Sequence, residues 1–190
     1  DSERTMCTYL GTAGKINEND LDENTIKNSQ LTFLEGYLWD EGSPKKAFDK
    51  AINLSNITAM SLSDKFCVDR HKDSFLNLLK NKLDIVFANE QEIFSLLNVR
   101  SIEEAIIFSK ELNKDIIITR GEKGAIAISQ SKVFKCDSKK NLNILDLTGA
   151  GDLFAAGYLH GKINNFSIQE CLEKGTELSS KIIQKIGARL

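Results

Sequence analysis

The 190-residue sequence has a single proline and no tract rich in proline, glycine or serine. Such tracts are typical of linkers between domains, so their absence favours one continuous domain. The sequence also lacks any apolar run near the roughly 18 residues that a membrane-spanning helix needs. Lysine and arginine total 25 against 27 aspartates and glutamates, which leaves a net charge of −2 and no excess positive charge for nucleic acid. We therefore expect no membrane and no nucleic-acid partner, and a cytoplasmic protein that acts on small molecules.

Residues that usually build metal centres are scarce as well. The sequence has two histidines and four cysteines, and no two cysteines have the CxxC spacing of zinc or redox sites. We interpret the cysteines as reduced thiols, mostly buried, and the histidines as ordinary surface or core residues. The sequence contains no GxxxxGK[ST] phosphate loop, which disfavours a P-loop ATPase. The remaining composition, 41% hydrophobic and 27% charged, is ordinary for a soluble globular protein.

Apolar residues follow two alternating patterns along the chain. Short apolar or β-branched runs predict strands, and apolar residues at three- and four-residue spacing predict helices. Strands are expected at 5–11, 31–34, 57–62, 85–88, 115–119, 126–128, 133–134 and 141–145. Helices are expected to begin at Ser43-Pro44 and to cover 75–79, 93–97, 101–112, 153–159 and 168–186. The alternation predicts an α/β fold with a mostly parallel sheet, in which ligands bind at the carboxyl ends of the strands.

The most informative segment is 146–152, Asp-Leu-Thr-Gly-Ala-Gly-Asp, a turn of small residues between an expected strand and an expected helix. If Thr148 caps that helix, the amides of Gly149, Ala150 and Gly151 are unpaired at its first turn. Unpaired amides and the positive end of the helix dipole favour an anion such as phosphate. The carboxylate that ends the segment would repel phosphate, but it suits a base that deprotonates an attacking hydroxyl. The segment therefore predicts a phosphate site with a catalytic base.

A second polar segment, Asn89-Glu90-Gln91-Glu92, follows the expected strand at 85–88. An amide and a carboxylate one helical turn apart share a face, and both offer oxygen ligands suited to Mg²⁺, usually through water. The simpler interpretation is a helix N-cap with its capping-box partner. Both interpretations can hold together.

A third segment, Thr119-Arg120-Gly121-Glu122-Lys123-Gly124, follows the three isoleucines of the strand at 115–119. Glycines let a backbone approach phosphates closely, and the threonine hydroxyl can donate to a phosphate oxygen. A hairpin turn between two strands would use two glycines as well. On its own the segment does not decide between a nucleotide loop and a simple turn.

The three segments resemble, in this order, the motifs of the ribokinase-like (PfkB) carbohydrate and nucleoside kinases. The second signature of that family is Asp-Thr-x-Gly-Ala-Gly-Asp, and this sequence departs from it at Leu147, where a threonine or another small residue is usual. Segments 34–40 and 63–71 further resemble bacterial adenosine-kinase-like members. The resemblance implies a three-layer α/β/α sandwich around a mostly parallel sheet. Because family members are usually much longer, we expect residues 1–190 to be the C-terminal portion of a single kinase domain, without the N-terminal part and the lid.

The resemblance also implies a reaction and a division of roles. It implies an ATP-dependent kinase that transfers the γ-phosphoryl group to a primary hydroxyl of a nucleoside or sugar, with adenosine favoured. Asp152 would be the catalytic base, and the amides of Gly149, Ala150 and Gly151 would hold the developing negative charge. Mg²⁺ would lie near Asn89 and Glu92. The residues implied to bind ATP are Asn89, Thr119, Gly121, Gly124 and Thr148.

Arg4 resembles an arginine that opens a comparable strand in the adenosine-kinase branch and reaches the transferred phosphate. A solvent-exposed arginine near a chain end is the alternative. Acceptor identity stays open, because the residues that decide it are expected upstream of Asp1. The sequence also leaves open whether K⁺ is needed and whether two chains form a homodimer.

Two other function classes fit parts of the sequence. The chain as given could be a non-catalytic nucleotide-binding or regulatory module, which nucleotide binding without phosphoryl transfer would reveal. An unrelated Rossmann-type enzyme could use the glycine turn for a dinucleotide. Against the latter, no G-x-G-x-x-G follows an early strand.

Overall fold

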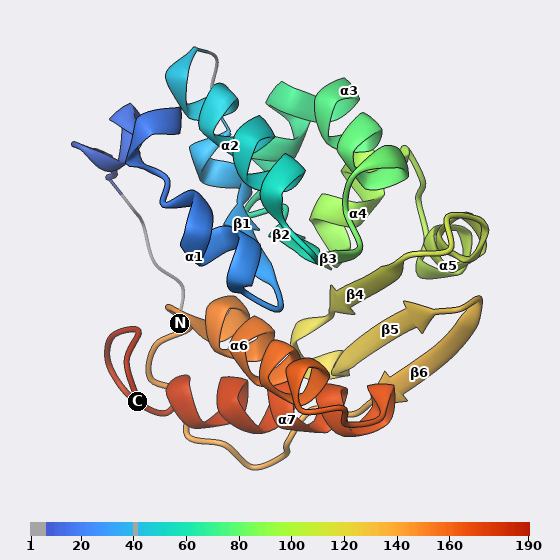
Figure 1. Cartoon of the computed structure of the whole chain (residues 1–190). Coiled ribbons are helices and arrows are strands. Elements are labelled where there is room, and N and C mark those ends of the chain that lie inside the picture. The colour runs from blue at the N-terminus through green and yellow to red at the C-terminus, as the bar shows by residue number, and fades with distance from the viewer. Residues whose placement is uncertain (1–6, 40–41) are drawn as a thin grey trace.

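The computed structural model of the protein describes residues 7–39 and 42–190. One six-stranded sheet runs through the described chain in the order β1-β2-β3-β4-β5-β6 (Figure 1). The strands are β1 (Thr32–Glu35), β2 (Thr58–Ser61), β3 (Ile85–Asn89), β4 (Asp115–Thr119), β5 (Ala125–Ser129) and β6 (Lys132–Cys136). Strand order therefore follows chain order across the sheet.

The strands β1 to β4 are parallel, whereas β5 and β6 form an antiparallel hairpin beside β4. In the β3–β4 register, Asn89 at the end of one strand pairs with Thr119 at the end of the other. Carboxyl ends of parallel strands lie at one edge of a sheet, where ligands bind. The polar segments that follow β3 and β4 therefore meet at this edge.

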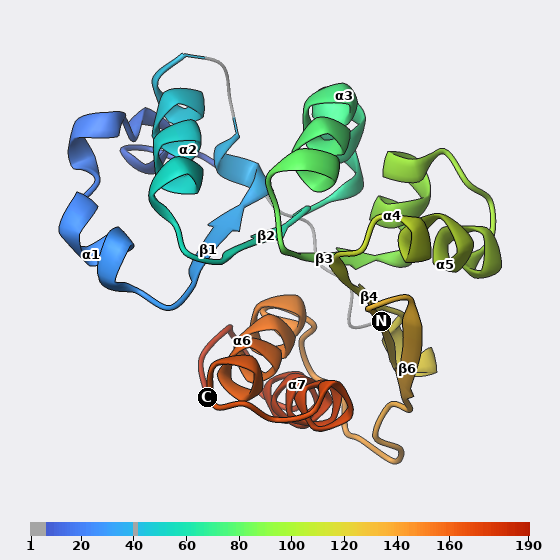
Figure 2. The same cartoon turned by 45° about the vertical axis from the view of Figure 1, so that its right-hand side comes forward.

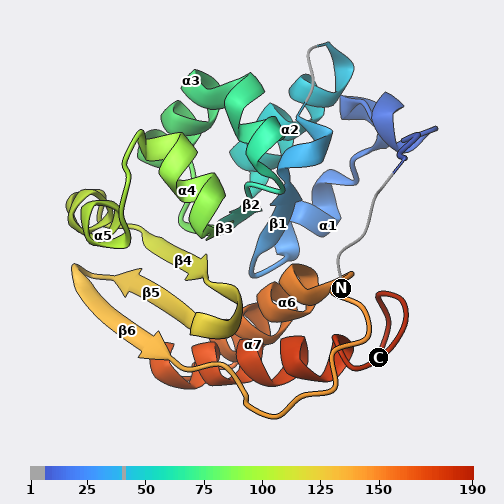
Figure 3. The same ribbon diagram turned by 180° about the vertical axis from the view of Figure 1, so that it is seen from behind.

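Helices cover both faces of the sheet. The helices are α1 (Glu23–Asn28), α2 (Ser43–Leu54), α3 (Lys65–Asn81), α4 (Glu90–Leu97), α5 (Ile102–Glu111), α6 (Ala150–Ile163) and α7 (Ile168–Ile182), with short 3₁₀ turns η1 (Ala13–Lys15), η2 (Glu18–Asp20), η3 (Gly36–Leu38) and η4 (Gly121–Lys123). Figure 2 shows α2, α3 and α4 on one side of the sheet and the antiparallel pair α6 and α7 on the other. The view from behind shows the same two groups (Figure 3). The arrangement is the expected α/β/α sandwich.

The central strands are buried on both faces, as a parallel sheet between two helical layers requires. Successive side chains of a strand point to opposite faces. In β3, Val86 packs into the core under α2 to α5, and Phe87 packs against Tyr158 of α6. In β4, Ile116 joins the first core and Ile117 the second. Continuous apolar runs rather than alternation in the sequence reflect this double burial.

Two expected strands are absent from the described chain. Residues 7–11 form no strand, and Tyr9 is 90% exposed. Residues 141–145 also form no strand, because the Leu145 amide donates to the Ile183 carbonyl beyond α7 (2.9 Å) instead of to a neighbouring strand. The last helix ends at Ile182, four residues before the expected 186. Apolar content alone did not reveal which segments have a strand beside them to pair with.

Candidate active site

Two adjoining pockets lie at the carboxyl ends of the parallel strands. Pocket 1 has a volume of about 350 Å³ and is lined by the ends of β1, β2 and β3 and by the start of α6. Pocket 2 has a volume of about 710 Å³ and lies between the loop after β4, the segment 138–144 and α7. Five residues line both pockets: Thr119, Leu147, Ala150, Gly151 and Phe154. The two pockets therefore share one wall.

The turn into α6 is built around Gly149 and Asp146. Gly149 has a φ of 79°, in the left-handed region, and a Cβ there would lie 2.9 Å from the Cβ of Ala188. Asp146 braces the turn, because its two carboxylate oxygens accept from the amides of Thr148 (2.8 Å) and Gly187 (2.9 Å). The expectation that Thr148 caps the helix is wrong. Gly149 is the N-cap residue and no side chain takes the capping role.

Backbone amides at the start of α6 are only partly used. The Ala150 amide donates to the Leu147 carbonyl (3.2 Å), whereas the amides of Gly149 and Gly151 donate to no described residue. A Cβ on Gly151 would have nothing within 4 Å, so the backbone here is open to pocket 1. Two free amides at the positive end of a helix dipole can hold an anion.

Asp152 lies in the first turn of α6, is exposed and lines pocket 1. Across the pocket stands Glu35, the last residue of β1. Burial raises the pKa of the Glu35 carboxyl, and the negative charge of Asp152 raises it further. Sequence reasoning treated Glu35 only as a subfamily mark, although its place at the end of an expected strand was a signal that it belongs to the site.

One wall of pocket 1 joins the two adenosine-kinase-like segments. The Tyr37 amide donates to Ser63 Oγ (3.1 Å) and the Tyr37 hydroxyl donates to the Ser63 carbonyl (3.2 Å). Ser63 has a φ of 75°, which is uncommon for a residue with a side chain. Burial, followed by the nearby Asp64 carboxylate, raises the pKa of Tyr37 to about 12, so its hydroxyl stays protonated as a donor. Both Tyr37 and Ser63 line the pocket.

Asn89 and Glu92 form a complete capping box at the start of α4. The Glu92 amide donates to Asn89 Oδ1 (2.9 Å), and the Glu92 carboxylate accepts from the Asn89 amide (2.9 Å) and from Asn89 Nδ2 (2.6 Å). Glu92 is 5% exposed, and burial raises its pKa to about 7. Both residues also line pocket 1. The capping role expected as the simpler interpretation is therefore present beside the pocket.

Thr119, Gly121 and Gly124 surround the side of pocket 2 that faces β4. Gly121 and Gly124 both have positive φ, 56° and 84°. A Cβ on Gly124 would lie 2.0 Å from the Cys136 carbonyl oxygen, so only glycine fits there. The opposite side of pocket 2 is formed by residues of α7 and its end: Thr176, Ser179, Ser180 and Ile183.

The two pockets therefore gather the residues singled out in the sequence. Asn89, Glu92, Thr148, Gly149 and Asp152 line pocket 1. Gly121 and Gly124 line pocket 2, and Thr119, Ala150 and Gly151 line both. Arg4 lies outside the described residues. Within the described chain no group of three or more histidine, cysteine, aspartate or glutamate side chains could hold a metal ion.

Leu147, the departure from the family signature, stands at the junction of the pockets and lines both. Its backbone carbonyl accepts from the Ala150 amide. The departure thus places an apolar side chain at the junction of the pockets. In the parts of the chain described, no helix is long and apolar enough to cross a membrane.

Known proteins resemble this chain in sequence and in fold. A family model, the pfkB family of carbohydrate kinases, matches residues 1–190. The adenosine kinase of Dictyostelium discoideum is 30% identical over 210 residues, which cover 98% of this chain and 60% of that protein. Fructoselysine 6-kinase of Escherichia coli is 28% identical over 161 residues, covering 84% of this chain and 57% of that protein.

Among solved structures, the adenosine kinase from Sinorhizobium meliloti superposes with a TM-score of 0.89 at 32% identity, over 93% of this chain and 56% of that one. The chain thus spans little more than half the length of these relatives. The superposition confirms the ribokinase-like α/β fold that the three motifs implied. By sequence and by structure, this chain belongs to the pfkB family of carbohydrate kinases.

Proposed function

We propose that this chain supplies the phosphoryl-transfer and nucleotide-binding part of an ATP-dependent kinase whose acceptor is a primary hydroxyl of a nucleoside or sugar. One observation supports it above all: Asp152 stands beside the free amides of Gly149 and Gly151 at the junction of two pockets. A base next to an anion site is what transfer of a phosphoryl group to a hydroxyl requires.

In the proposed reaction, pocket 2 holds ATP with its phosphates toward Gly151, and pocket 1 holds the acceptor. Asp152 takes the proton of the acceptor hydroxyl as its oxygen bonds to the γ-phosphorus. The bond between that phosphorus and the β,γ-bridging oxygen breaks, and ADP leaves with the bridging oxygen. The free amides of Gly149 and Gly151 stabilise the charge on the phosphoryl oxygens, because fixed dipoles lose no energy in reorienting.

Mg²⁺ belongs to the proposal as the cation that neutralises phosphate charge. Both carboxylate oxygens of Glu92 already accept hydrogen bonds from Asn89, at 2.9 and 2.6 Å. The pair therefore fits contact through water molecules of the ion rather than direct coordination, as Mg²⁺ commonly prefers. Glu92 and Asn89 would hold the hydrated ion at the edge of pocket 1, where it would neutralise phosphate charge.

Adenosine is the acceptor we favour. Support comes from the two segments joined by the Tyr37–Ser63 hydrogen bonds, which resemble adenosine-kinase-like members, and from the adenosine kinases among the relatives. A sugar acceptor is the second candidate, favoured by the likeness to fructoselysine 6-kinase. A cytoplasmic location is part of the proposal, since ATP is the proposed phosphoryl donor.

The test is mass-spectrometric detection of phosphorylated product. The full-length gene product that contains this chain is incubated with ATP, Mg²⁺ and, separately, adenosine, ribose, fructose and keto-deoxy sugar acids. We expect AMP from adenosine. If a sugar phosphate is the only product, the proposed mechanism stands and the acceptor is a sugar rather than adenosine. ATP binding without any product would instead favour the non-catalytic nucleotide-binding module.

A further inference from the structure

An ion pair joins the two segments expected to hold ATP and Mg²⁺, although neither motif specifies it. Arg120 Nε lies 2.6 Å from Glu90 Oε1, and Lys123 Nζ lies 3.7 Å from Glu90 Oε2. The side chains of Arg120 and Glu90 are only 20% and 25% exposed. Both positions are variable letters in the motifs, so sequence reasoning passed over them.

The Glu90–Arg120 pair lies beside two residues that are expected to bind Mg²⁺·ATP. Glu90 directly follows Asn89 and Arg120 directly follows Thr119, and these two neighbours are register partners at the ends of β3 and β4. The Arg120 amide also donates to the Gly124 carbonyl (2.8 Å), which closes the nucleotide loop 119–124. Holding the Arg120 side chain therefore holds the whole loop against the start of α4.

Electrostatic interactions favour the closed ion pair between Glu90 and Arg120 over separated side chains. Glu90 is in the first turn of α4, where a negative charge also interacts favourably with the helix dipole. A half-buried pair has less water to compensate either charge if its partner is removed. Arg120 is not among the residues that line the two pockets, and its side chain contacts Glu90 instead.

We propose that Glu90 and Arg120 are a positioning pair for the nucleotide, which fixes the loop 119–124 relative to Asn89 and Glu92 so that both can meet one Mg²⁺·ATP. The inference rests on the proposed function, because it assigns these residues to nucleotide binding. It adds that affinity for the nucleotide depends on two side chains that do not touch it.

The experiment measures the dissociation constant of Mg²⁺·AMP-PNP by calorimetry on the wild-type protein and on Glu90→Gln, Arg120→Gln and the double variant. Each single change should raise the dissociation constant on the order of tenfold, the ratio that about 1.4 kcal/mol produces. The double variant should bind no more weakly than Glu90→Gln, since Glu90→Gln already removes the ion pair with Arg120 together with the longer contact to Lys123. Arg120→Lys keeps the charge and should restore part of the affinity.

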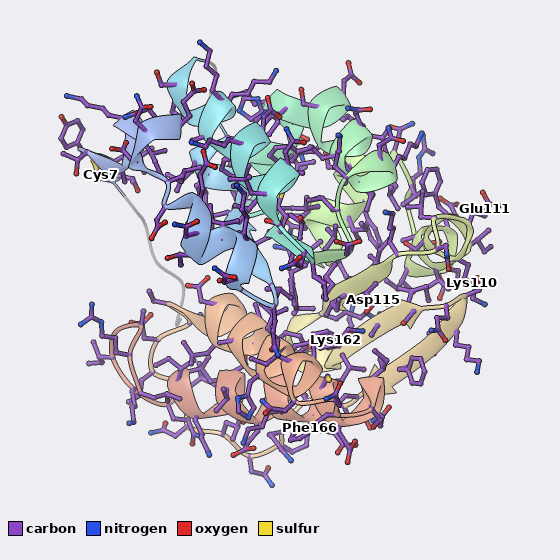
Figure 4. The ribbon with its side chains drawn as sticks, in the orientation of Figure 1. Cys7, Lys110, Glu111, Asp115, Lys162 and Phe166 are labelled. Carbon is purple, nitrogen blue, oxygen red and sulfur yellow. The ribbon has the colours of Figure 1, made fainter. Side chains whose placement is uncertain are left out.

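A matched control lies at the other end of the same strand. Asp115, the first residue of β4, pairs with Lys162 of α6 at 2.7 Å, with side chains 15% and 32% exposed (Figure 4). Asp115→Asn removes an ion pair of similar length and burial, far along β4 from the loop. It should lower the melting temperature and leave the dissociation constant of Mg²⁺·AMP-PNP unchanged.

The outcomes separate the inference from the proposed function. Wild-type protein that binds no Mg²⁺·AMP-PNP would refute the proposed function and the inference with it. Wild-type binding with an unchanged constant in Glu90→Gln would refute the inference alone. If the dissociation constant rises in Arg120→Gln and not in Glu90→Gln, Arg120 contacts the nucleotide directly. That result would also refute the positioning role of the pair. If Asp115→Asn weakens Mg²⁺·AMP-PNP binding as much as the Glu90 and Arg120 variants do, the effect comes from lower protein stability and the inference is refuted.

Discussion

Gly124 and Gly121 test why the loop 119–124 contains two glycines. Both have positive φ, 84° and 56°, within one short loop. A Cβ on Gly124 would lie 2.0 Å from the Cys136 carbonyl oxygen and 2.9 Å from backbone atoms of Asp137 and Ser138. A Cβ on Gly121 would have nothing within 4 Å. Both alanine variants place a side chain at positive φ. Gly124, with φ 84° and ψ −139°, lies close to a region that essentially only glycine adopts, and it alone also meets a clash.

The magnitudes follow from these distances. Strain of a left-handed backbone costs alanine about 1–2 kcal/mol, and Gly121→Ala should lose about that much. Gly124→Ala must also displace a backbone carbonyl by more than an ångström at the start of the β5–β6 ladder, so we expect a total of about 3–5 kcal/mol. At about 2–4 °C per kcal/mol for a chain of this size, the melting temperature of Gly124→Ala should fall by roughly 6–20 °C.

Thermal unfolding followed by circular dichroism on both variants provides the measurement. Gly124→Ala should melt well below Gly121→Ala. Equal melting temperatures would refute the reasoning, because the clash with Cys136 would then contribute nothing.

Two further predictions concern stability. Burial raises the pKa of Glu92 to about 7, so the folded protein holds this proton more tightly than the unfolded chain. The free energy of unfolding should therefore fall by about 3 kcal/mol as pH rises from about 4.5 to 7. Urea unfolding at several pH values measures this dependence, and a Glu92→Gln variant with the same pH dependence would contradict the prediction. Gly157→Ala should cost about 1–3 kcal/mol, because its Cβ would lie 2.6 Å from the Lys174 carbonyl between α6 and α7. Gly151→Ala in the same helix meets no atom within 4 Å and should cost nothing in a parallel melting experiment.

Much of the fold could be predicted because the buried strands have continuous apolar runs. The three isoleucines of β4 and the apolar segment before Asn89 predicted a sheet with helices on both faces. The strand expected at 141–145 is wrong for a physical reason: the Leu145 amide donates to the Ile183 carbonyl, and no sequence pattern states which segments become neighbours. Pairing is a tertiary property, whereas apolar content is local.

Candidate site residues were predicted where a motif requires a particular chemistry. The glycine turn and Asp152 could be found because only a few residue types fit a phosphate site. The place of Glu35 in the pocket wall and the Glu90–Arg120 ion pair were missed, because both depend on which strand ends lie side by side. The cap at Gly149 rather than Thr148 was missed as well, because the helix begins one residue later than expected, after a glycine with positive φ and no capping side chain.

The central claim is that Asp152 is the base for phosphoryl transfer, and the Asp152→Asn variant tests it most directly. Turnover and the dissociation constant of Mg²⁺·ATP would be measured for both proteins with the acceptor that wild-type protein phosphorylates. We predict that turnover falls by several orders of magnitude while ATP binding stays nearly intact, because the amide keeps the shape of the site and cannot take the proton. Unchanged turnover in Asp152→Asn would contradict the account.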